Sequence, residues 1–336
     1  MDKNQLRLTS SEIGTLWGQY MNGTAVEIIN KYMYSIVEDP KIKALFKDAI
    51  ETFSRQKSQV TDFIKNEGFP VPVGFSESSD LFTCETRLFS DIFCLHFLHI
   101  ITLHGLLGHT TSLSSSVRKD LRSFYDSCDN DGKKMYHQTS ELLLEKGHFQ
   151  KDPLFYPDES PTFIDGQDFM TGFFGEKRPL AATEMIALSL NIKKKILEKS
   201  LAIGFSQVTQ SKEVRQFLMS LQKTSDDQIQ DLGKILKGDN LPVPMSWESE
   251  ITNSAESPFS DKVILYLIGF LIQASQNYHG AGLASAMRTD LVYSYEKIIL
   301  KNLMVTKEWF NIMAKNKWLE QPPLAPNRNR IAQDEH

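Results

Sequence analysis

The stretch Phe69–Pro72, which reads Phe-Pro-Val-Pro, recurs later in the chain as Leu241–Pro244, which reads Leu-Pro-Val-Pro. Placing one turn on the other aligns residues 8–72 with 180–244 without a gap. Beyond the turn the two copies align again, with a separation along the chain that is two residues smaller. A unit of roughly 150 residues therefore occurs twice, and this is a usual size for one domain.

Composition restricts the class of protein. The chain has 336 residues, a net charge of -5 and a pI near 5.9, so we expect no nucleic-acid partner, because phosphate binding needs a basic face. Cys84, Cys94 and Cys128 are odd in number and show no paired spacing, which predicts reduced thiols rather than disulfides or a zinc site. The N-terminus lacks the pattern of a signal peptide, so we expect a protein that stays inside the cell.

Apolar residues recur with helical spacing in both copies. The first helix begins at the capping-box pattern of Thr9 and Glu12, and Glu67-Gly68 stops the second. A polar connection of about 20 residues follows the Pro-Val-Pro turn and is long enough to cross a whole bundle. The predicted helices span 9–38, 41–66, 87–110 and 115–147 in the first copy, and 181–209, 212–238, 257–280 and 285–316 in the second.

The most apolar run, Ile92–Leu107, has the composition of a membrane span but is short and contains His96, His99 and His104. We expect it to be a buried central helix, and we expect no membrane span.

Four helices with two tight connections and one long crossover between them describe a ferritin-like bundle. We therefore predict an all-α protein of two tandem ferritin-like four-helix bundles, each with a long crossover between its second and third helices. The predicted parts are a first bundle at 1–152, a linker at 153–179, a second bundle at 180–326 and a flexible tail at 327–336.

Several motifs recur in order over nearly the whole chain: Leu8–Ile13 with Leu16 and Trp17, the Pro-Val-Pro turn, Phe-Ser-Asp, Ser-x-x-Arg-x-Asp-Leu, and Trp318–Pro323. They resemble a bacillar family of unknown function whose members resemble spore coat proteins and carry tandem ferritin-like bundles. The resemblance implies a spore-forming bacterium. We expect a non-enzymatic structural or interaction protein, cytoplasmic or spore-associated, with other proteins such as spore coat components as partners. The oligomeric state stays open.

Two matching polar clusters are predicted where the first and fourth helices begin and the third ends. They consist of Glu12, His109, Arg118 and Asp120 in the first copy and of Glu184, His279, Arg288 and Asp290 in the second. Such clusters either bind a small anion or cap and cross-link helix ends. Because both copies retain the set, we favour the structural interpretation.

A ferritin-type dimetal centre needs Glu from two helices and Glu-x-x-His from the other two. The only Glu-x-x-His is Glu145–His148 at a helix end, so we expect no such centre. A looser site for Fe, Mn or Zn stays open at His96 and His99, which are three apart on one helix, with Glu27 as a third ligand. The competing interpretation makes both histidines core residues, and on it no cofactor is predicted.

A third class of function also stays open. Helical bundles commonly hold small ligands in pockets between their helices, and a duplicated bundle adds the space between its two halves.

Overall fold

The computed structural model describes residues 7–156, 160–173 and 177–333. Residues 157–159 and 174–176 of the predicted linker, residues 334–336 of the predicted tail, and residues 1–6 lie outside the described part.

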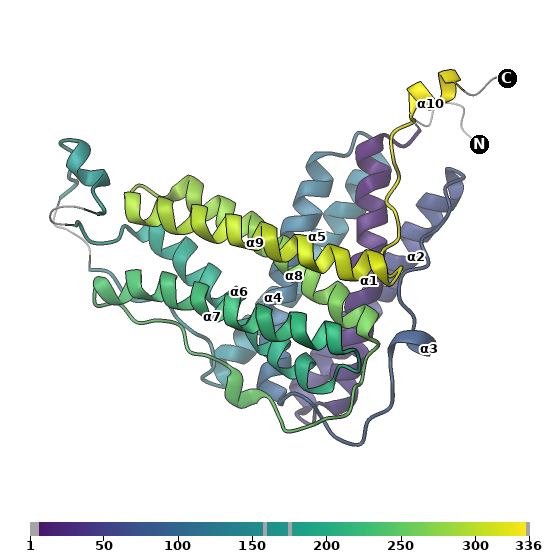
Figure 1. Cartoon of the computed structure of the whole chain (residues 1–336), viewed down its shortest axis with the longest axis horizontal. Helices are drawn as coiled ribbons and strands as arrows, with labels where there is room; N and C mark the ends of the chain where they lie inside the picture. The colour runs from purple at the N-terminus through teal and green to yellow at the C-terminus, as the bar shows by residue number, and fades with distance from the viewer. Residues whose placement is uncertain (1–6, 157–159, 174–176, 334–336) are drawn as a thin grey trace.

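Eight long helices form two bundles (Figure 1). Bundle 1 consists of α1 (Ser10–Ile36), α2 (Pro40–Asn66), α4 (Asp91–Ser114) and α5 (Lys119–Glu145). Bundle 2 consists of α6 (Ala182–Val208), α7 (Lys212–Gly238), α8 (Asp261–Ser285) and α9 (Thr289–Lys315). The short helices are α3 (Glu77–Asp80), the 3₁₀ turns η1 (Gln167–Met170) and η2 (Glu248–Glu250), and α10 (Arg328–Gln333). In Figure 1 the helices of bundle 2 lie across those of bundle 1.

The described residues contain no β-strand, and the chain folds as two tandem four-helix bundles with a crossover between the second and third helix of each. The prediction of the fold class is confirmed. One hydrophobic cluster runs through both bundles, from Met21 in α1 to Met313 in α9, so the two halves pack against each other.

The two crossovers pair with each other in a reciprocal way. Leu81 of the first bridges Phe259 of the second, and Phe89 of the first bridges Ile251 of the second. Leu81 aligns with Ile251 and Phe89 with Phe259 in the duplicated sequence, so each bridge is the counterpart of the other. This reciprocity is that of an isologous dimer interface, here within one chain.

The duplicated Phe-Ser-Asp motif begins the third helix of each bundle. Its serine caps the helix, because the Oγ accepts the backbone N–H three residues later. Its aspartate holds the preceding hairpin: Asp91 accepts the N–H of Asp39 at 2.7 Å, and Asp261 accepts that of Ser211 at 2.8 Å. The motif therefore fixes the end of the crossover against the turn between the first two helices.

Two helix starts differ from the prediction. The third helices begin at Asp91 and Asp261 rather than near residues 87 and 257, because the preceding residues are extended and bonded to the other crossover. The fourth helices begin at Lys119 and Thr289 rather than near 115 and 285. A glutamate of the first helix binds the N–H groups of the two residues before each of these starts, which keeps them out of the helix.

Helix α4 is the one helix in the described part that is long and apolar enough, by composition, to cross a membrane. In the structure it packs along α5, and most of its first three turns are buried, from Phe93 to Leu98 without a break.

Candidate functional site

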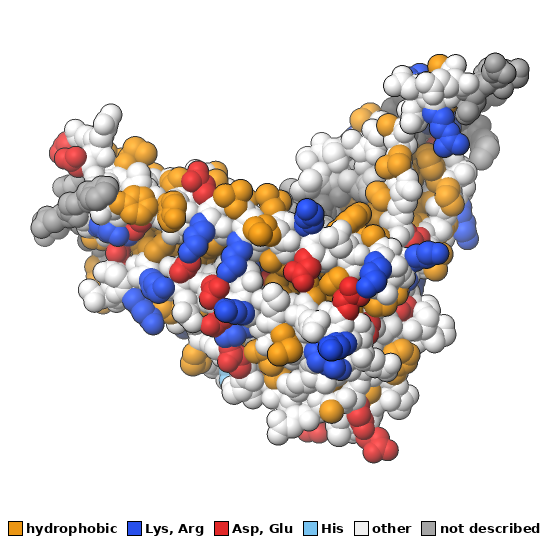
Figure 2. Space-filling view, viewed as in Figure 1, with side chains coloured by type: hydrophobic (Ala, Val, Ile, Leu, Met, Phe, Trp, Pro, Cys, Tyr) orange, Lys and Arg blue, Asp and Glu red, His pale blue; other side chains and the backbone are white. Residues whose placement is uncertain are grey.

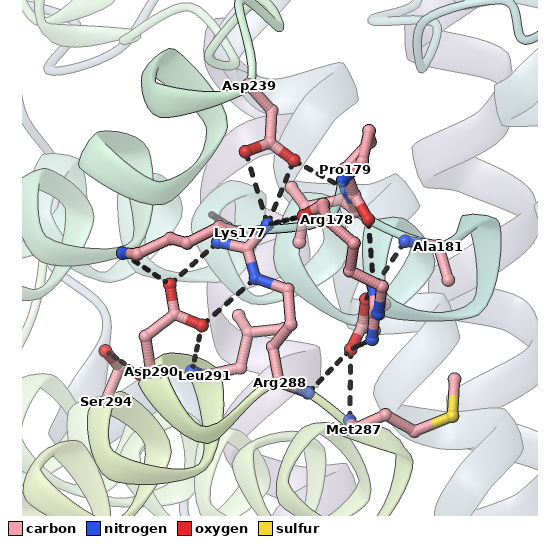
Figure 3. Close-up of polar contacts among 12 residues, drawn as sticks. Lys177, Arg178, Pro179, Ala181, Asp239, Met287, Arg288, Asp290, Leu291 and Ser294 are labelled. Atoms are coloured by element: carbon pink, nitrogen blue, oxygen red, sulfur yellow. Dashed lines mark hydrogen bonds and ion pairs between the residues drawn. The ribbon is translucent and has the colours of Figure 1, made fainter. Parts of the chain in front are cut away.

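A network of charged side chains joins three helix ends in bundle 2 (Figure 3). Arg288 is 1% exposed and precedes α9; its Nε and Nη2 donate to Asp290 at 3.1 and 2.7 Å. Its Nη1 donates to Asp239, the residue that ends α7, at 3.0 Å. Glu184 in the first turn of α6 accepts the backbone N–H groups of Met287 and Arg288 at 3.0 and 3.1 Å.

The segment before α6 completes this network. Arg178 forms a bidentate pair with Glu184, at 2.8 and 2.9 Å, and its guanidinium lies 4.0 Å from the ring centroid of Phe169. Lys177 adds an ion pair with Asp290 at 3.3 Å. Each guanidinium nitrogen of Arg288 thus has an acceptor, so the geometry supports cross-linking of helix ends rather than anion binding.

Bundle 1 repeats the network in a smaller form. Arg118 donates to Asp120 at 3.1 and 2.6 Å and to Glu67, and its backbone N–H donates to Glu12 at 2.8 Å. Glu12 accepts the backbone N–H of Thr9 at 2.8 Å, as Glu184 accepts that of Ala181 at 3.0 Å. It also accepts the hydroxyl of Thr9 at 2.9 Å, where Glu184 takes an arginine.

Burial by itself would raise the pKa of Glu184, but the hydrogen bonds from Arg178 and from backbone N–H groups outweigh it. The pKa of this carboxyl is therefore lowered to about 2. The pKa of Glu12 is lowered too: burial opposes the shift, and the N–H groups of Arg118 and Thr9 cause it. Both glutamates are charged at neutral pH.

His109 and His279, which the sequence placed in these clusters, lie elsewhere. His109 Nε2 lies 3.3 Å from Gln19 Nε2, and His279 Nδ1 lies 3.3 Å from Asn302 Nδ2. The third helices continue to Ser114 and Ser285, so both histidines lie more than one turn before the helix end and are buried in the bundle interiors.

The three residues proposed as metal ligands are not brought together. The ring of His96 stacks on Trp247, with centroids 4.1 Å apart, and His99 Nδ1 lies 3.0 Å from Thr139 Oγ1. Glu27 binds Lys31 and Lys57, each at 2.6 Å, and these ion pairs give no support to a role as a third ligand. In the described part of the chain, no three His, Cys, Asp or Glu side chains converge in a way that could hold a metal.

Bundle 1 instead encloses a cavity of about 130 Å³ between its four helices, and Phe270 of α8 contributes to its wall. Its walls are mostly apolar, including Val26, Phe53, Leu98 and Ile101. In bundle 2 the corresponding helices, α6 and α8, pack closely along each other, whereas α1 and α4 touch over a short length only. The cavity occupies the space between them.

Glycines make this space. Gly23, Gly105 and Gly132 line the cavity, and Gly108 lies at its exposed edge. At Gly23 an added Cβ would meet no heavy atom within 4 Å. Their counterparts in bundle 2 carry side chains, which are Lys195, Ser275 and Asn302, all buried, and the half-buried Tyr278. A glycine inside a helix costs about 1 kcal/mol relative to alanine, so Gly23 and Gly105, where a Cβ would fit, lower the stability of bundle 1.

The cavity also holds polar groups without partners. His104 is 5% exposed, and neither of its ring nitrogens has a hydrogen-bond partner among the described residues. His109 has an unpartnered Nδ1, while its Nε2 faces Gln19. Burial lowers the pKa of both imidazoles, which are therefore neutral at neutral pH. A neutral imidazole offers one donor and one acceptor to a guest molecule.

The outer faces of the fourth helices differ in polarity (Figure 2). Along α9 the exposed apolar side chains are Tyr293, Leu300, Leu303, Met304 and Phe310. The residues aligned with them in α5 are Ser123, Asn130, Lys133, Lys134 and Ser140. Among the described residues, the apolar outer stripe of α9 thus has no counterpart at the aligned positions of α5.

Comparison with known proteins gives a family. The family model described as a protein of unknown function, DUF3231, matches residues 1–160 and again residues 168–331. The chain belongs to the DUF3231 family. The two matches also reproduce the predicted duplication, and no curated protein matches the sequence. A crystal structure of a proposed spore coat protein from Bacillus halodurans C-125 is similar at 16% identity and a TM-score of 0.42, over 45% of this chain and 98% of that one.

Sequence reasoning missed two kinds of residue in this DUF3231 chain. Glu67 and Asp239 complete the arginine networks, and their alignment immediately before the duplicated turn was the available signal. The glycines of the cavity were visible as mismatches between the copies, such as Gly23 against Lys195. Only the packing of four helices shows that these mismatches share one space.

Proposed function

We propose that this DUF3231 protein binds a small, uncharged and mostly apolar molecule inside bundle 1. The observation that carries the proposal is the cavity lined by Gly23, Gly105 and Gly132, whose counterpart positions in bundle 2 bury side chains. At Gly23 an added Cβ would meet nothing and at Gly105 only His109, at 3.7 Å, so neither glycine is required by close packing. Helix stability given up at such positions is expected of a site that must stay open.

The size and the lining of the cavity suggest the class of ligand. A cavity of about 150 Å³ lined by apolar side chains is known to bind benzene, and the cavity in bundle 1 is nearly as large. His104 and His109 lack hydrogen-bond partners that a guest hydroxyl or N–H group would supply. A small aromatic ring with one hydroxyl or N–H group, such as phenol or indole, fits both conditions.

The role suggested by the family resemblance is a separate proposal. We infer for this chain a structural or interaction role in a spore-forming bacterium, in the cytoplasm or in the coat, and a ferritin-like ancestry of each bundle. Ligand binding is compatible with that role, because the cavity lies between the helices of bundle 1 and opens to the surface at one edge, near Gly108.

Phenol, indole and toluene are the probes that test the binding proposal. We expect phenol and indole to raise the melting temperature of the wild-type protein, since a ligand that binds only the folded state stabilises it. Gly23→Leu fills the cavity and should abolish the shift. The matched control is Gly280→Leu, at an exposed glycine of α8 where an added Cβ also meets nothing.

Equal shifts in both glycine variants, or no shift in the wild type with any probe, would overturn the proposal. His104→Phe tests the need for a hydroxyl or N–H group on the ligand separately from the need for an apolar ring. It removes the ring nitrogens but keeps an aromatic side chain, so it should weaken phenol binding more than toluene binding. Circular dichroism of each variant confirms that it is folded.

A further inference from the structure

A second cavity, of about 230 Å³, lies between the two bundles. Its walls come from α4 and α5 of bundle 1, from α6 of bundle 2, and from the segments around Gln150 and Trp247. Tyr136, Phe149 and Trp247 give it aromatic walls, and Ile100, Leu103 and Leu143 add aliphatic surface. None of the residues that line it belongs to the cavity of bundle 1.

Lys194 of α6 borders this cavity and is 3% exposed. Its Nζ has no hydrogen-bond partner among the described residues and lies 3.5 Å from the ring centroid of Tyr278. The aligned residue of the first copy, Asn22, accepts a hydrogen bond from the Tyr266 hydroxyl at 3.1 Å. At the Asn22 side of the pseudo-symmetric interface the polar groups are thus hydrogen-bonded to each other. At the Lys194 side a buried amine has no anion beside it.

No carboxylate in the described cavity wall is bonded to Lys194. Asp152 is the acidic residue that lines it, and its Oδ1 accepts hydrogen bonds from Lys193 at 3.1 Å and from Ser189 instead. A second donor also lacks a partner, because the indole Nε1 of the buried Trp247 is unpaired among the described residues. Buried donors without acceptors are costly, so two of them at one cavity indicate an acceptor that comes from outside the chain.

We infer that this cavity binds a small aromatic carboxylate, which pairs its charge with Lys194, accepts a hydrogen bond from Trp247 and packs its ring on the aromatic walls. The volume is larger than that of the cavity in bundle 1 and admits a benzoate or an indole carboxylate. A carboxylate has two oxygens, which suits two separate donors.

The charge state of the site changes on binding. Burial lowers the pKa of Lys194 well below its ordinary value, which favours the neutral amine when no counter-ion is present. A carboxylate beside it favours the ammonium form, so we expect binding to be coupled to proton uptake. The other titratable groups that face Lys194 or line the cavity are His96, His99 and His104 of α4, Tyr136 of α5, Lys193 of α6, Tyr278 of α8 and Asp152. Burial lowers the pKa of His96 to about 3 and that of His99 to about 4, so neither is charged beforehand.

Isothermal titration calorimetry with benzoate and indole-3-acetate tests the inference, in two buffers of different ionisation enthalpy near neutral pH. The wild type should bind with uptake of about one proton, and affinity should fall as the pH rises. Lys194→Met should weaken binding roughly tenfold or more and remove the proton uptake. Lys223→Met, at an exposed lysine of α7, is the control and should change neither.

Absence of carboxylate binding to the wild type, or equal binding to Lys194→Met, would overturn the inference. Because methionine removes an unpaired buried amine, this variant should be at least as stable as the wild type. Trp247→Phe, which keeps a ring but removes the donor, gives an independent reading and should bind several-fold more weakly. Gly23→Leu should leave benzoate binding unchanged, which separates this site from the one in bundle 1.

Discussion

Bundle 1 leaves open the space that bundle 2 fills with polar side chains. In bundle 2 the buried Lys195 pairs with the buried Glu198 at 2.8 Å, and Ser225 donates to the same carboxylate at 2.8 Å. The aligned residues of bundle 1 are Gly23, Val26 and Phe53, which line the cavity. The two copies have kept one set of helices and diverged in the interior.

The helix ends show the opposite behaviour. Each bundle has a buried arginine before its fourth helix that binds an aspartate two residues later and an acidic residue at the end of its second helix. These contacts hold together helix ends that are distant in sequence. The difference teaches that the two copies kept the contacts at the helix ends while the residues of the interior diverged.

The largest expected difference between the bundles concerns these arginines. Arg288→Met should destabilise the protein by about 3 kcal/mol, because it removes the ion pair of Asp239 and leaves Asp290 with Lys177 alone. Arg118→Met should cost about 1–2 kcal/mol, since its partner Asp120 has a side chain that is 38% exposed and water can replace the arginine there. Urea unfolding followed by circular dichroism measures both, and equal losses would show that the networks are equivalent.

Low pH should have the second-largest effect, and it should destabilise the network around Glu184 more than the network around Glu12. The pKa of Glu184 is about 2 in the folded protein against an ordinary value of 4.5, so its contribution is complete above about pH 4.5 and is lost as the pH falls toward 2. We expect a loss on the order of 2–3 kcal/mol over this window. Urea unfolding at a series of pH values measures it.

Two variants check the origin of this acid sensitivity. Glu184→Gln should flatten the profile between about pH 4.5 and 2, since the amide cannot titrate. Glu12→Gln should flatten it less, because Glu12 has Thr9 in place of the arginine. A larger effect of Glu12→Gln would reverse the ranking of the two networks.

The smallest expected effect concerns single glycines. Gly23→Ala should stabilise the protein by about 1 kcal/mol, because alanine is the better helix former and the added methyl group meets nothing. Gly282→Ala in bundle 2 should destabilise it, because its Cβ would lie 2.5–2.8 Å from the buried ring of Tyr295. Melting temperatures of both variants test the contrast, and stabilisation by both would mean that the interiors are packed alike.

Much of the architecture follows from local signals in the sequence. Thr9 and Glu12 form the predicted capping box, and the Glu67-Gly68 pair ends the second helix as expected. These features act through the backbone of neighbouring residues, so they are readable without the fold. The predicted starts of α4 and α8 were wrong, because these starts depend on contacts with residues that are distant in sequence, namely the bridges to the opposite crossover.

The candidate sites were less predictable, for the same reason. The sequence placed Glu12, Arg118 and Asp120 together, and they are together, but it assigned His109 to them and Glu27 to a metal site. Each of these assignments depends on which face of a helix meets which neighbour, and a small change in helix length or phase alters that.

By itself the sequence determined the duplication, the helices and the crossovers, because periodicity, capping and alignment of the copies are local or internal properties of the chain. Only the tertiary structure decided that three glycines from three helices share one cavity, and that Lys194 is buried without an anion at the interface between the bundles. Whether space is open and whether a charge is paired depend on every neighbour at once, and those neighbours come from separate parts of the chain.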